Sequence, residues 1–260
     1  MTMQVTRLSV TPIKGLALSH PASIDITNTG ATGDRAFYLV DADDRLVSIA
    51  KTGALVGLSA TWDEDGQILT VSGSGGALLT GVLSLGERHV ANFFGFREAV
   101  GRVVEGDWGQ IFSDLAGQPL RLVKADDSNG GRDVEPLTLL GDASTAELAR
   151  RSGLEQVDSR RFRMLIEFDG AAPHEEDSWD GQTLTVGGAV IVGGGPVQRC
   201  AGTTRNPLSG EVDLRTLTLI GGYRGRQGSI FGPGFNFGVY ATTLVPGRVS
   251  VGDVLRLEQP

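Results

Sequence analysis

The single cysteine of the chain, Cys200, lies in a segment whose residue types could do chemistry. Arg199 and Arg205 flank it, and glycine, proline, threonine and asparagine dominate the surrounding stretch 193–211. This composition is typical of a polar loop that follows a strand. Cationic neighbours favour the thiolate, the form of cysteine that attacks electrophiles and binds soft metals. The alternative interpretation is a tight turn that happens to contain a cysteine.

Basic residues beside glycine, proline or strand ends form a second candidate group, made of Lys14, Arg35, Lys51, Arg161 and Arg163. Arginine binds phosphate through two parallel hydrogen bonds, and lysine binds it as a point charge. If these cations converge, they predict a site for an anionic ligand. Taken one at a time, each is better explained by a surface ion pair with one of the many acidic residues.

Several common classes of site and partner are disfavoured. The three histidines have no metal-binding spacing, and Ser229 lacks the Gly-x-Ser-x-Gly frame of a serine hydrolase. One cysteine excludes an intramolecular disulfide and an iron–sulfur cluster held by this chain alone. The net charge of -8 is opposite to that of most nucleic-acid binders. There is no apolar stretch of about 18 residues and no signal peptide, so we expect no membrane span and a cytoplasmic protein.

The elements that must position these residues are predicted to be mainly β. Short apolar segments bounded by turn residues predict strands at Gln4–Val10, Arg35–Val40, Leu46–Ile49, Gln67–Val71, Leu120–Val123, Arg163–Glu167, Thr183–Val186, Ala189–Val192 and Val254–Leu257. Such strands, with 38 glycines for turns and corners, favour barrels or sandwiches over an alternating βαβ chain.

Two short helices interrupt this pattern. Trp108–Ala116 places apolar residues on one face and is followed by Gly117, a plausible C-terminal stop. The second helix is predicted from Ser144 to Arg151, because Ser144 and Glu147 have the spacing of a capping box. Each helix is expected to cover a sheet edge.

The polar stretch 125–133 predicts a mobile surface loop, and the glycine-rich segment 223–237 a mobile flap. We place a domain boundary between them and the first helix, which gives domains at residues 1–118 and 119–260. The predicted fold is an N-terminal β-barrel-like domain followed by a C-terminal β-barrel domain.

Several motifs together closely resemble the MOSC (molybdenum cofactor sulfurase C-terminal) domain. They are Arg199-Cys200 followed by Asn206-Pro-Leu-Ser-Gly210-Glu, the upstream Glu176-Asp-Ser-Trp179 and Arg161-Phe-Arg163, and the ending Phe237-Gly-Val-Tyr240. Pro12-Ile-Lys14 and Gly33-Asp-Arg35 are similar to the N-terminal β-barrel domain of the mitochondrial amidoxime-reducing component and its bacterial relatives. The chain departs from those relatives at Gly15, at Gly141 and at Met164-Leu165, where they usually carry hydroxyl or amide side chains.

The resemblance implies a molybdenum cofactor of the Mo-molybdopterin type. Carried over by position, Cys200 becomes the molybdenum ligand and the catalytic centre, and Lys14, Arg35 and Arg163 become contacts of the pterin or its phosphate. Lys51, Arg161 and Arg199 are added as neighbouring cations that could bind the cofactor. Thr203 and Asn206 either touch the cofactor or only shape the loop after Cys200.

The activity implied is the reduction of N-hydroxylated small molecules such as amidoximes and hydroxylamines. The chain lacks a redox centre of its own, so a separate electron donor of the ferredoxin, flavin or cytochrome type is expected. Two alternatives use the same thiol or the same basic residues. In one, Cys200 carries sulfur for cofactor sulfuration, and in the other the protein carries or stores the cofactor without a substrate.

Overall fold

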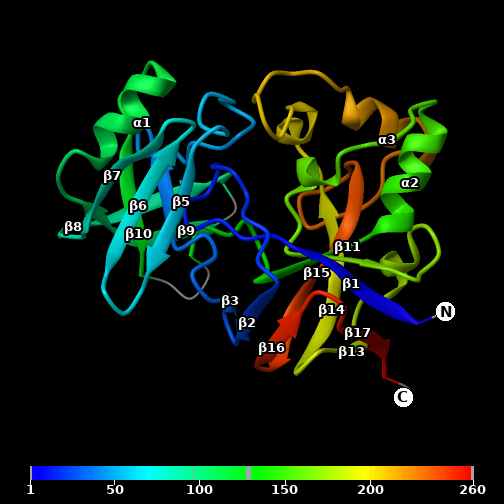
Figure 1. Ribbon diagram of the computed structural model, residues 1–260. Helices are drawn as coiled ribbons and strands as arrows, with labels where there is room; N and C mark the ends of the chain where they lie inside the picture. Colours follow the sequence, from blue (N-terminus) through cyan, green and yellow to red (C-terminus); the bar gives the residue numbers. More distant parts are fainter. Residues whose placement is uncertain (1, 96, 127–129, 259–260) are drawn as a thin grey trace.

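The computed structural model describes residues 2–95, 97–126 and 130–258, which form two β-rich halves side by side (Figure 1). In one half, hereafter the barrel half, seven strands close into a barrel in the order β1-β12-β11-β15-β14-β13-β17. Neighbouring strands are antiparallel except β11 and β12. The strands run over Met3–Leu8 (β1), Leu137–Gly141 (β11), Ile166–Asp169 (β12), Thr183–Val186 (β13), Ala189–Gln198 (β14), Asn236–Val245 (β15) and Val254–Leu257 (β17).

The other half, hereafter the N-terminal half, contains two sheets around a second core. A four-stranded sheet has the order β4-β10-β9-β8, and a three-stranded sheet has the order β5-β6-β7. Their strands run over Phe37–Val40 (β4), Ser59–Asp63 (β5), Ile68–Gly73 (β6), Gly76–Val82 (β7), Leu85–Phe93 (β8), Arg97–Val104 (β9) and Arg121–Ala125 (β10). Apolar residues of both sheets share one cluster, so the sheets pack against each other. The predicted mainly β fold with barrel-like halves is confirmed.

The two halves exchange strands across the predicted boundary at residues 118 and 119. The first strand, β1, pairs with β12 and β17 in the barrel half before the chain crosses to the N-terminal half (Figure 1). A small third sheet has the order β16-β2-β3, with strands at Gly247–Ser250 (β16), Ser23–Thr27 (β2) and Gly30–Ala31 (β3). It therefore joins chain segments from the two ends of the sequence. The boundary itself stays a prediction.

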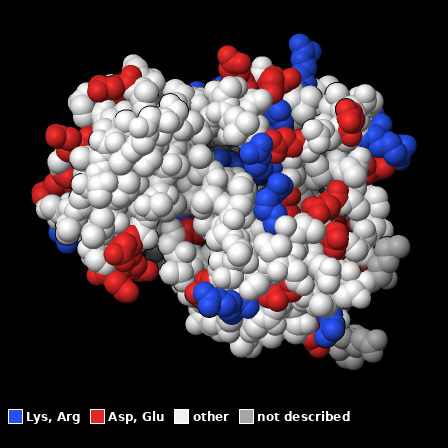
Figure 2. Space-filling view, viewed as in Figure 1, with Lys and Arg blue, Asp and Glu red and all other residues white. Residues whose placement is uncertain are grey.

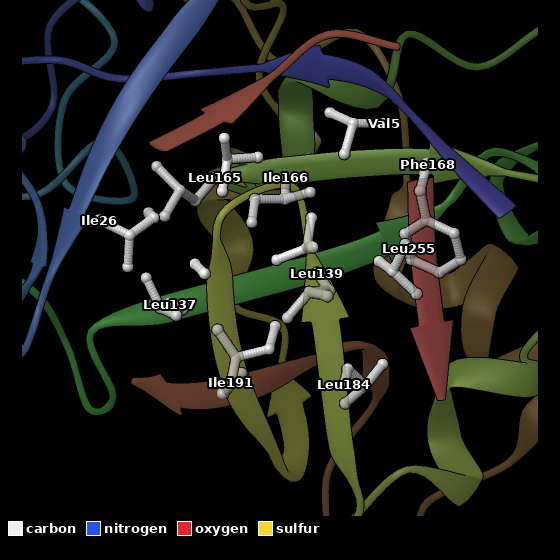
Figure 3. Packing of buried hydrophobic residues seen from close by; sticks show 14 of the residues in the cluster. Val5, Ile26, Leu137, Leu139, Leu165, Ile166, Phe168, Leu184, Ile191 and Leu255 are labelled. Carbon is white, nitrogen blue, oxygen red and sulfur yellow. The ribbon is translucent and has the colours of Figure 1, made fainter. Parts of the chain in front are cut away.

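The barrel interior is filled by aliphatic and aromatic side chains from every side of the barrel (Figure 3). Along β13, Leu184 and Val186 are buried and alternate with half-buried threonines, as the two-residue period of a strand requires. Phe168 packs against Trp179 with ring centroids 5.0 Å apart. This core holds the start of β12, the end of β14 and the middle of β15 beside the candidate site described below.

Three α-helices lie among the described residues: Trp108–Ala116 (α1), Asp142–Arg151 (α2) and Thr216–Arg224 (α3). The predicted bounds of α1 are confirmed, with Gly117 in the left-handed conformation as its C-cap. α1 packs on β10, and α2 packs on β11 and β12. No helix in the described part of the chain is long and apolar enough to cross a membrane. The sequence reading did not anticipate α3.

The predicted capping box at the start of α2 is wrong. The helix begins two residues earlier, at Asp142, with Gly141 as its N-cap. The Ser144 hydroxyl is buried and donates to Glu176 Oε1 at 2.7 Å instead of capping the helix. Its tertiary partner, 32 residues away, outweighs the local spacing that predicted a cap.

Three of the predicted strands begin two or more residues late or do not form. β4 starts at Phe37 because Arg35 has a φ of 53°, and β12 starts at Ile166 because Arg163 also has a φ of 53°. Residues with a left-handed backbone cannot continue a strand. Leu46–Ile49 is not a strand, because Ser48 opens a turn. The Ser48 carbonyl accepts a hydrogen bond from Lys51 N–H at 2.9 Å.

The predicted mobile surface loop at 125–133 is corrected where the structure describes it. Residues 127–129 lie outside the described residues. Gly130, Gly131 and Arg132 are buried, and Gly131 N–H donates to Arg35 O at 2.7 Å. A Cβ at position 131 would lie 3.0 Å from that same oxygen, so the glycine permits this close approach. The segment is therefore packed between the two halves.

Candidate functional site

A cavity of about 300 Å³ lies between the two halves of the molecule. Figure 2 shows Lys and Arg side chains gathered in the hollow between the halves, while much of the surrounding surface is uncharged. Both halves and the segment that joins them contribute to its walls. The lining residues are Lys14, Gly15, Arg35, Ser48, Ile49, Phe94, Arg132, Asp133, Glu135, Pro136, Thr138, Arg161, Phe162, Arg163, Met164, Leu165, Val197, Gln198, Arg199, Cys200, Gly202, Thr203, Phe231 and Tyr240.

Most of the site residues predicted from the sequence meet at this cavity. They are Lys14, Arg35, Arg161, Arg163, Arg199, Cys200 and Thr203. Two predicted residues do not line it. Lys51 pairs with Asp41, with Nζ and Oδ2 3.3 Å apart, and the Asn206 side chain accepts from the backbone N–H groups of Leu208 and Ser209. Asn206 therefore shapes the loop after Cys200.

Cys200 is exposed at the cavity and precedes a short 3-10 helix, Ala201–Thr204 (η3). Its Sγ accepts a hydrogen bond from Gly202 N–H at 3.4 Å. The Thr203 hydroxyl donates to Cys200 O at 3.0 Å and lies 2.6 Å from the hydroxyl of Thr216 at the start of α3. The backbone of the loop is thus anchored while the thiol stays open to the cavity.

The cations of the cavity fall into two groups by their partners. Lys14 Nζ lies 2.6 Å from Asp133 Oδ1, Arg35 pairs with Asp34 at 2.5 Å, and Arg161 pairs with Asp213 at 2.6 Å. Arg163 and Arg199 form no ion pair with any carboxylate in the described part of the chain. Arg163 donates to Leu16 O at 2.7 Å, and Arg199 donates to Phe162 O.

The electrostatics of the cavity show an excess of positive charge. Burial lowers the pKa of Arg163 to about 9, and the nearby Arg35 adds to this effect. Burial also lowers the pKa values of Arg199 and Lys14. Burial acts to raise the pKa of Asp133, but Lys14, Arg35 and Arg199 together outweigh it and hold that pKa below its usual range. An added anion would relieve this crowding.

Backbone strain is concentrated at the cavity. Among the described residues, six non-glycine residues have positive φ, and three of them, Arg35, Phe94 and Arg163, line the cavity. The left-handed conformation costs an L-residue about 1 kcal/mol, and such strain persists where the surrounding structure enforces it. The fold therefore holds both arginines and one aromatic ring in place against their local preference.

Several lining residues were missed by sequence reasoning. Arg132 and Asp133 lie in the segment that was predicted to be a surface loop; the adjacent Gly130-Gly131 pair was the signal for close backbone packing. Tyr240 lies on β15, within the motif Phe237-Gly-Val-Tyr240. Burial raises the pKa of Tyr240, so its hydroxyl keeps its proton at neutral pH and can donate a hydrogen bond at the cavity wall.

Behind the cavity, the half-buried His174 forms a contact that predicts a pH dependence. Its Nε2 shares a 3.0 Å hydrogen bond with the Tyr223 hydroxyl, and its ring packs edge-on against Phe237, whose ring lies 4.5 Å from that of Phe162 in the cavity wall. Burial, helped by Arg224, lowers the pKa of His174 to about 4. The unfolded chain therefore binds a proton near pH 6.5 that the folded chain does not.

We expect the free energy of unfolding of the wild type to fall as the pH falls from 6.5 toward 4. The fall should be smaller in His174→Gln. The pKa of Glu176 is raised by burial, which acts in the opposite direction on stability but is common to both proteins. Thermal unfolding across this pH range measures the difference. Equal loss of Tm in the two proteins would contradict the assignment.

Two family models together match most of the chain. Residues 2–118 match the family model of the MOSC N-terminal beta barrel domain, and residues 126–256 match that of the MOSC domain. No curated protein matches the chain.

The solved structures to which the chain shows similarity include three bacterial proteins. The YUAD protein from Bacillus subtilis is 12% identical with a TM-score of 0.47, over 98% of this chain and 94% of that one. YiiM from Geobacillus stearothermophilus is 14% identical with a TM-score of 0.34, over 68% of this chain and 73% of that one. YiiM from Escherichia coli is 18% identical with a TM-score of 0.34, over 52% and 59%.

Proposed function

This chain belongs to the MOSC domain family, and from that premise we propose that it is a molybdenum-cofactor-dependent oxidoreductase that reduces N-hydroxylated small molecules. One observation carries the proposal. An exposed cysteine thiol, Cys200, opens onto a cavity in which two arginines, Arg163 and Arg199, have no carboxylate partner among the described residues. A soft ligand beside unbalanced positive charge suits a metal cofactor that carries a phosphate.

The residues present fit such a cofactor. Arg199 Nε is buried without a hydrogen-bond partner among the described residues, so the cavity offers a donor to a ligand. No group of three or more His, Cys, Asp or Glu side chains able to hold a metal exists among residues 2–95, 97–126 and 130–258. A metal held by Cys200 in this cavity would therefore need further ligands from outside the protein, which a pterin dithiolene provides.

In this proposal each residue has a simple task. When bound, the cofactor supplies the two-electron exchange at molybdenum. Cys200 Sγ would hold the metal, and Arg163 and Arg199, which have no carboxylate partner among the described residues, would hold the phosphate. Tyr240 donates a hydrogen bond from its protonated hydroxyl at the cavity wall.

The overall reaction balances for an amidoxime substrate. Two electrons and two protons break the N–O bond, the oxygen leaves as water, and an amidine remains. The electrons come from a separate donor of the ferredoxin, flavin or cytochrome type, because one cysteine cannot ligate an iron–sulfur cluster. The direct test is benzamidoxime reduction by purified holoprotein with a chemical electron donor. Formation of benzamidine supports the proposal, and its absence in molybdenum-loaded protein contradicts it.

Replacing Arg163 with methionine is expected to lower the amount of cofactor retained on purification by about tenfold or more, because a charge-assisted hydrogen bond contributes about 1.5–3 kcal/mol. The Tm should not fall, since methionine removes a guanidinium that is costly to bury. Molybdenum and pterin analysis measures the loss.

Arg161→Met is the matched control for this variant. Arg161 also lines the cavity, but its guanidinium is already paired with Asp213. We expect its cofactor content to stay near that of the wild type. Equal losses in Arg163→Met and Arg161→Met would contradict the distinction between paired and unbalanced cations.

A further inference from the structure

The exposed Phe, Trp and Tyr side chains of the described residues are gathered at one place. Among the Phe, Trp and Tyr side chains that the structure describes, only Phe94 and Phe231 are exposed, at 55% and 39%. Both line the cavity that contains Cys200. The remaining described Phe, Trp and Tyr residues are buried or half-buried, so this pairing is not a general feature of the surface.

Phe94 comes from the N-terminal half, at the turn that joins β8 to β9. Asn92 Oδ1 accepts from Gly95 N–H at 2.6 Å and closes this turn. The backbone of Phe94 has a φ of 58°, a left-handed conformation that a bulky residue rarely adopts. The ring also contacts that of Phe93 edge-on, at 6.3 Å between centroids. The turn therefore presents this ring to the cavity at a cost in local strain.

Phe231 comes from the barrel half, in the loop between α3 and β15. Its N–H donates to Ser229 Oγ at 3.1 Å, and the same hydroxyl is hydrogen-bonded to Gln198, two residues before Cys200. Gln227 and Gly234 exchange backbone hydrogen bonds of 2.8 and 2.9 Å at the base of the loop. The loop that holds Phe231 is thus braced against the end of β14, two residues before Cys200.

We infer that Phe94 and Phe231 form an aromatic entrance that selects substrates with a flat aromatic group next to the N-hydroxyl group; this inference rests on the proposed function. The cavity lining includes cations that suit the cofactor phosphate, whereas the two exposed rings offer apolar faces to a substrate that enters from solvent. Burying an aromatic ring of the substrate between aromatic side chains gains both apolar area and ring packing. A small aliphatic N-hydroxylated compound cannot make these contacts.

Equilibrium binding of benzamidoxime and acetamidoxime to the oxidised holoprotein, without reductant, tests the entrance. We expect the wild type to bind benzamidoxime about tenfold more tightly, and Phe94→Ala and Phe231→Ala each to lose most of that preference. Binding of acetamidoxime should change by less than about twofold. Leu244→Ala, an exposed residue outside the cavity lining, is the control and should keep the preference.

Phe94→Gly separates a role in recognition from a role in folding. Glycine accepts a positive φ without strain, so the Tm should stay at or above that of the wild type while benzamidoxime binds less tightly. If the preference for benzamidoxime survives in Phe94→Ala, Phe231→Ala and Phe94→Gly, the entrance is overturned.

Turnover with a chemical electron donor distinguishes this inference from the proposed function. If the wild type prefers benzamidoxime in binding but reduces neither compound, the proposed function fails and the entrance stands. If it reduces both with equal efficiency and the variants behave like the wild type, the entrance fails and the function stands. Should the variants lose only turnover driven by a protein electron donor, the two rings dock that partner and the inference is overturned.

Discussion

Replacing Cys200 with alanine is expected to lower benzamidoxime reduction by at least about 100-fold, since even the residues that support metal ligands commonly contribute 10–100-fold. The Tm should be almost unchanged. The side chain is exposed, and its one hydrogen bond to protein is the 3.4 Å contact from Gly202 N–H. Steady-state turnover with a chemical electron donor, together with thermal unfolding, measures both effects.

The neighbouring residue offers a matched control for this variant. Ala201 is also exposed and is the first residue of η3, the short helix that Cys200 precedes. Ala201→Ser adds a hydroxyl there without removing the thiol. Its activity should stay close to that of the wild type. Retained activity in Cys200→Ala would rule out the thiol as the metal ligand.

A second large effect is expected at Gly53, where two loops cross with their backbones in contact. A Cβ at Gly53 would lie 2.0 Å from Gly210 O and 2.8 Å from Gly210 Cα. Because the obstructing atoms are backbone, the loops must separate to accept a side chain. Gly53→Ala should lower the free energy of unfolding by about 2–4 kcal/mol.

The same substitution should also lower activity, because the loop containing Gly53 forms part of the cavity. Ser48 and Ile49 line the cavity, and a Cβ at Gly202 would lie 2.7 Å from Ile49 Cγ2, so this loop packs directly on the residues after Cys200. Separating the loops moves that wall away from the thiol. Denaturant unfolding and turnover of the same variant measure the two effects.

Gly57→Ala is the control for this prediction. Gly57 lies in the same loop, and a Cβ there meets no atom within 4 Å. Its stability should change by less than about 0.5 kcal/mol. Similar losses in Gly53→Ala and Gly57→Ala would show that the crossing with Gly210 is not the cause.

Features set by local patterns were predictable from the sequence. The period of apolar residues in Trp108–Ala116 and the glycine after it predicted α1 with its observed bounds, and short apolar runs predicted Thr183–Val186 and Val254–Leu257. The capping-box spacing at Ser144 misled, because a buried glutamate from a distant segment bonds that hydroxyl. Local chemistry predicts an element well only where no tertiary contact competes for the same group.

Several charged residues of the candidate site were predicted from the sequence, but the ion pairs and backbone conformations that position its side chains were not. Lys14, Arg163 and Cys200 stand out by residue type and motif, and the structure brings them to one cavity. The paired state of Arg161 and the placement of Phe94 depend on contacts with residues far apart in the chain. No local pattern reveals a left-handed arginine or phenylalanine, since glycine is the residue that normally signals such a backbone.

The molybdenum and pterin content of purified wild-type and Cys200→Ala proteins tests the central claim most directly. The account predicts stoichiometric molybdenum with pterin fluorescence in the wild type and loss of most of the molybdenum in the variant. A wild-type protein that contains neither, and carries labile sulfane sulfur on Cys200 instead, would contradict the account and identify a sulfur carrier.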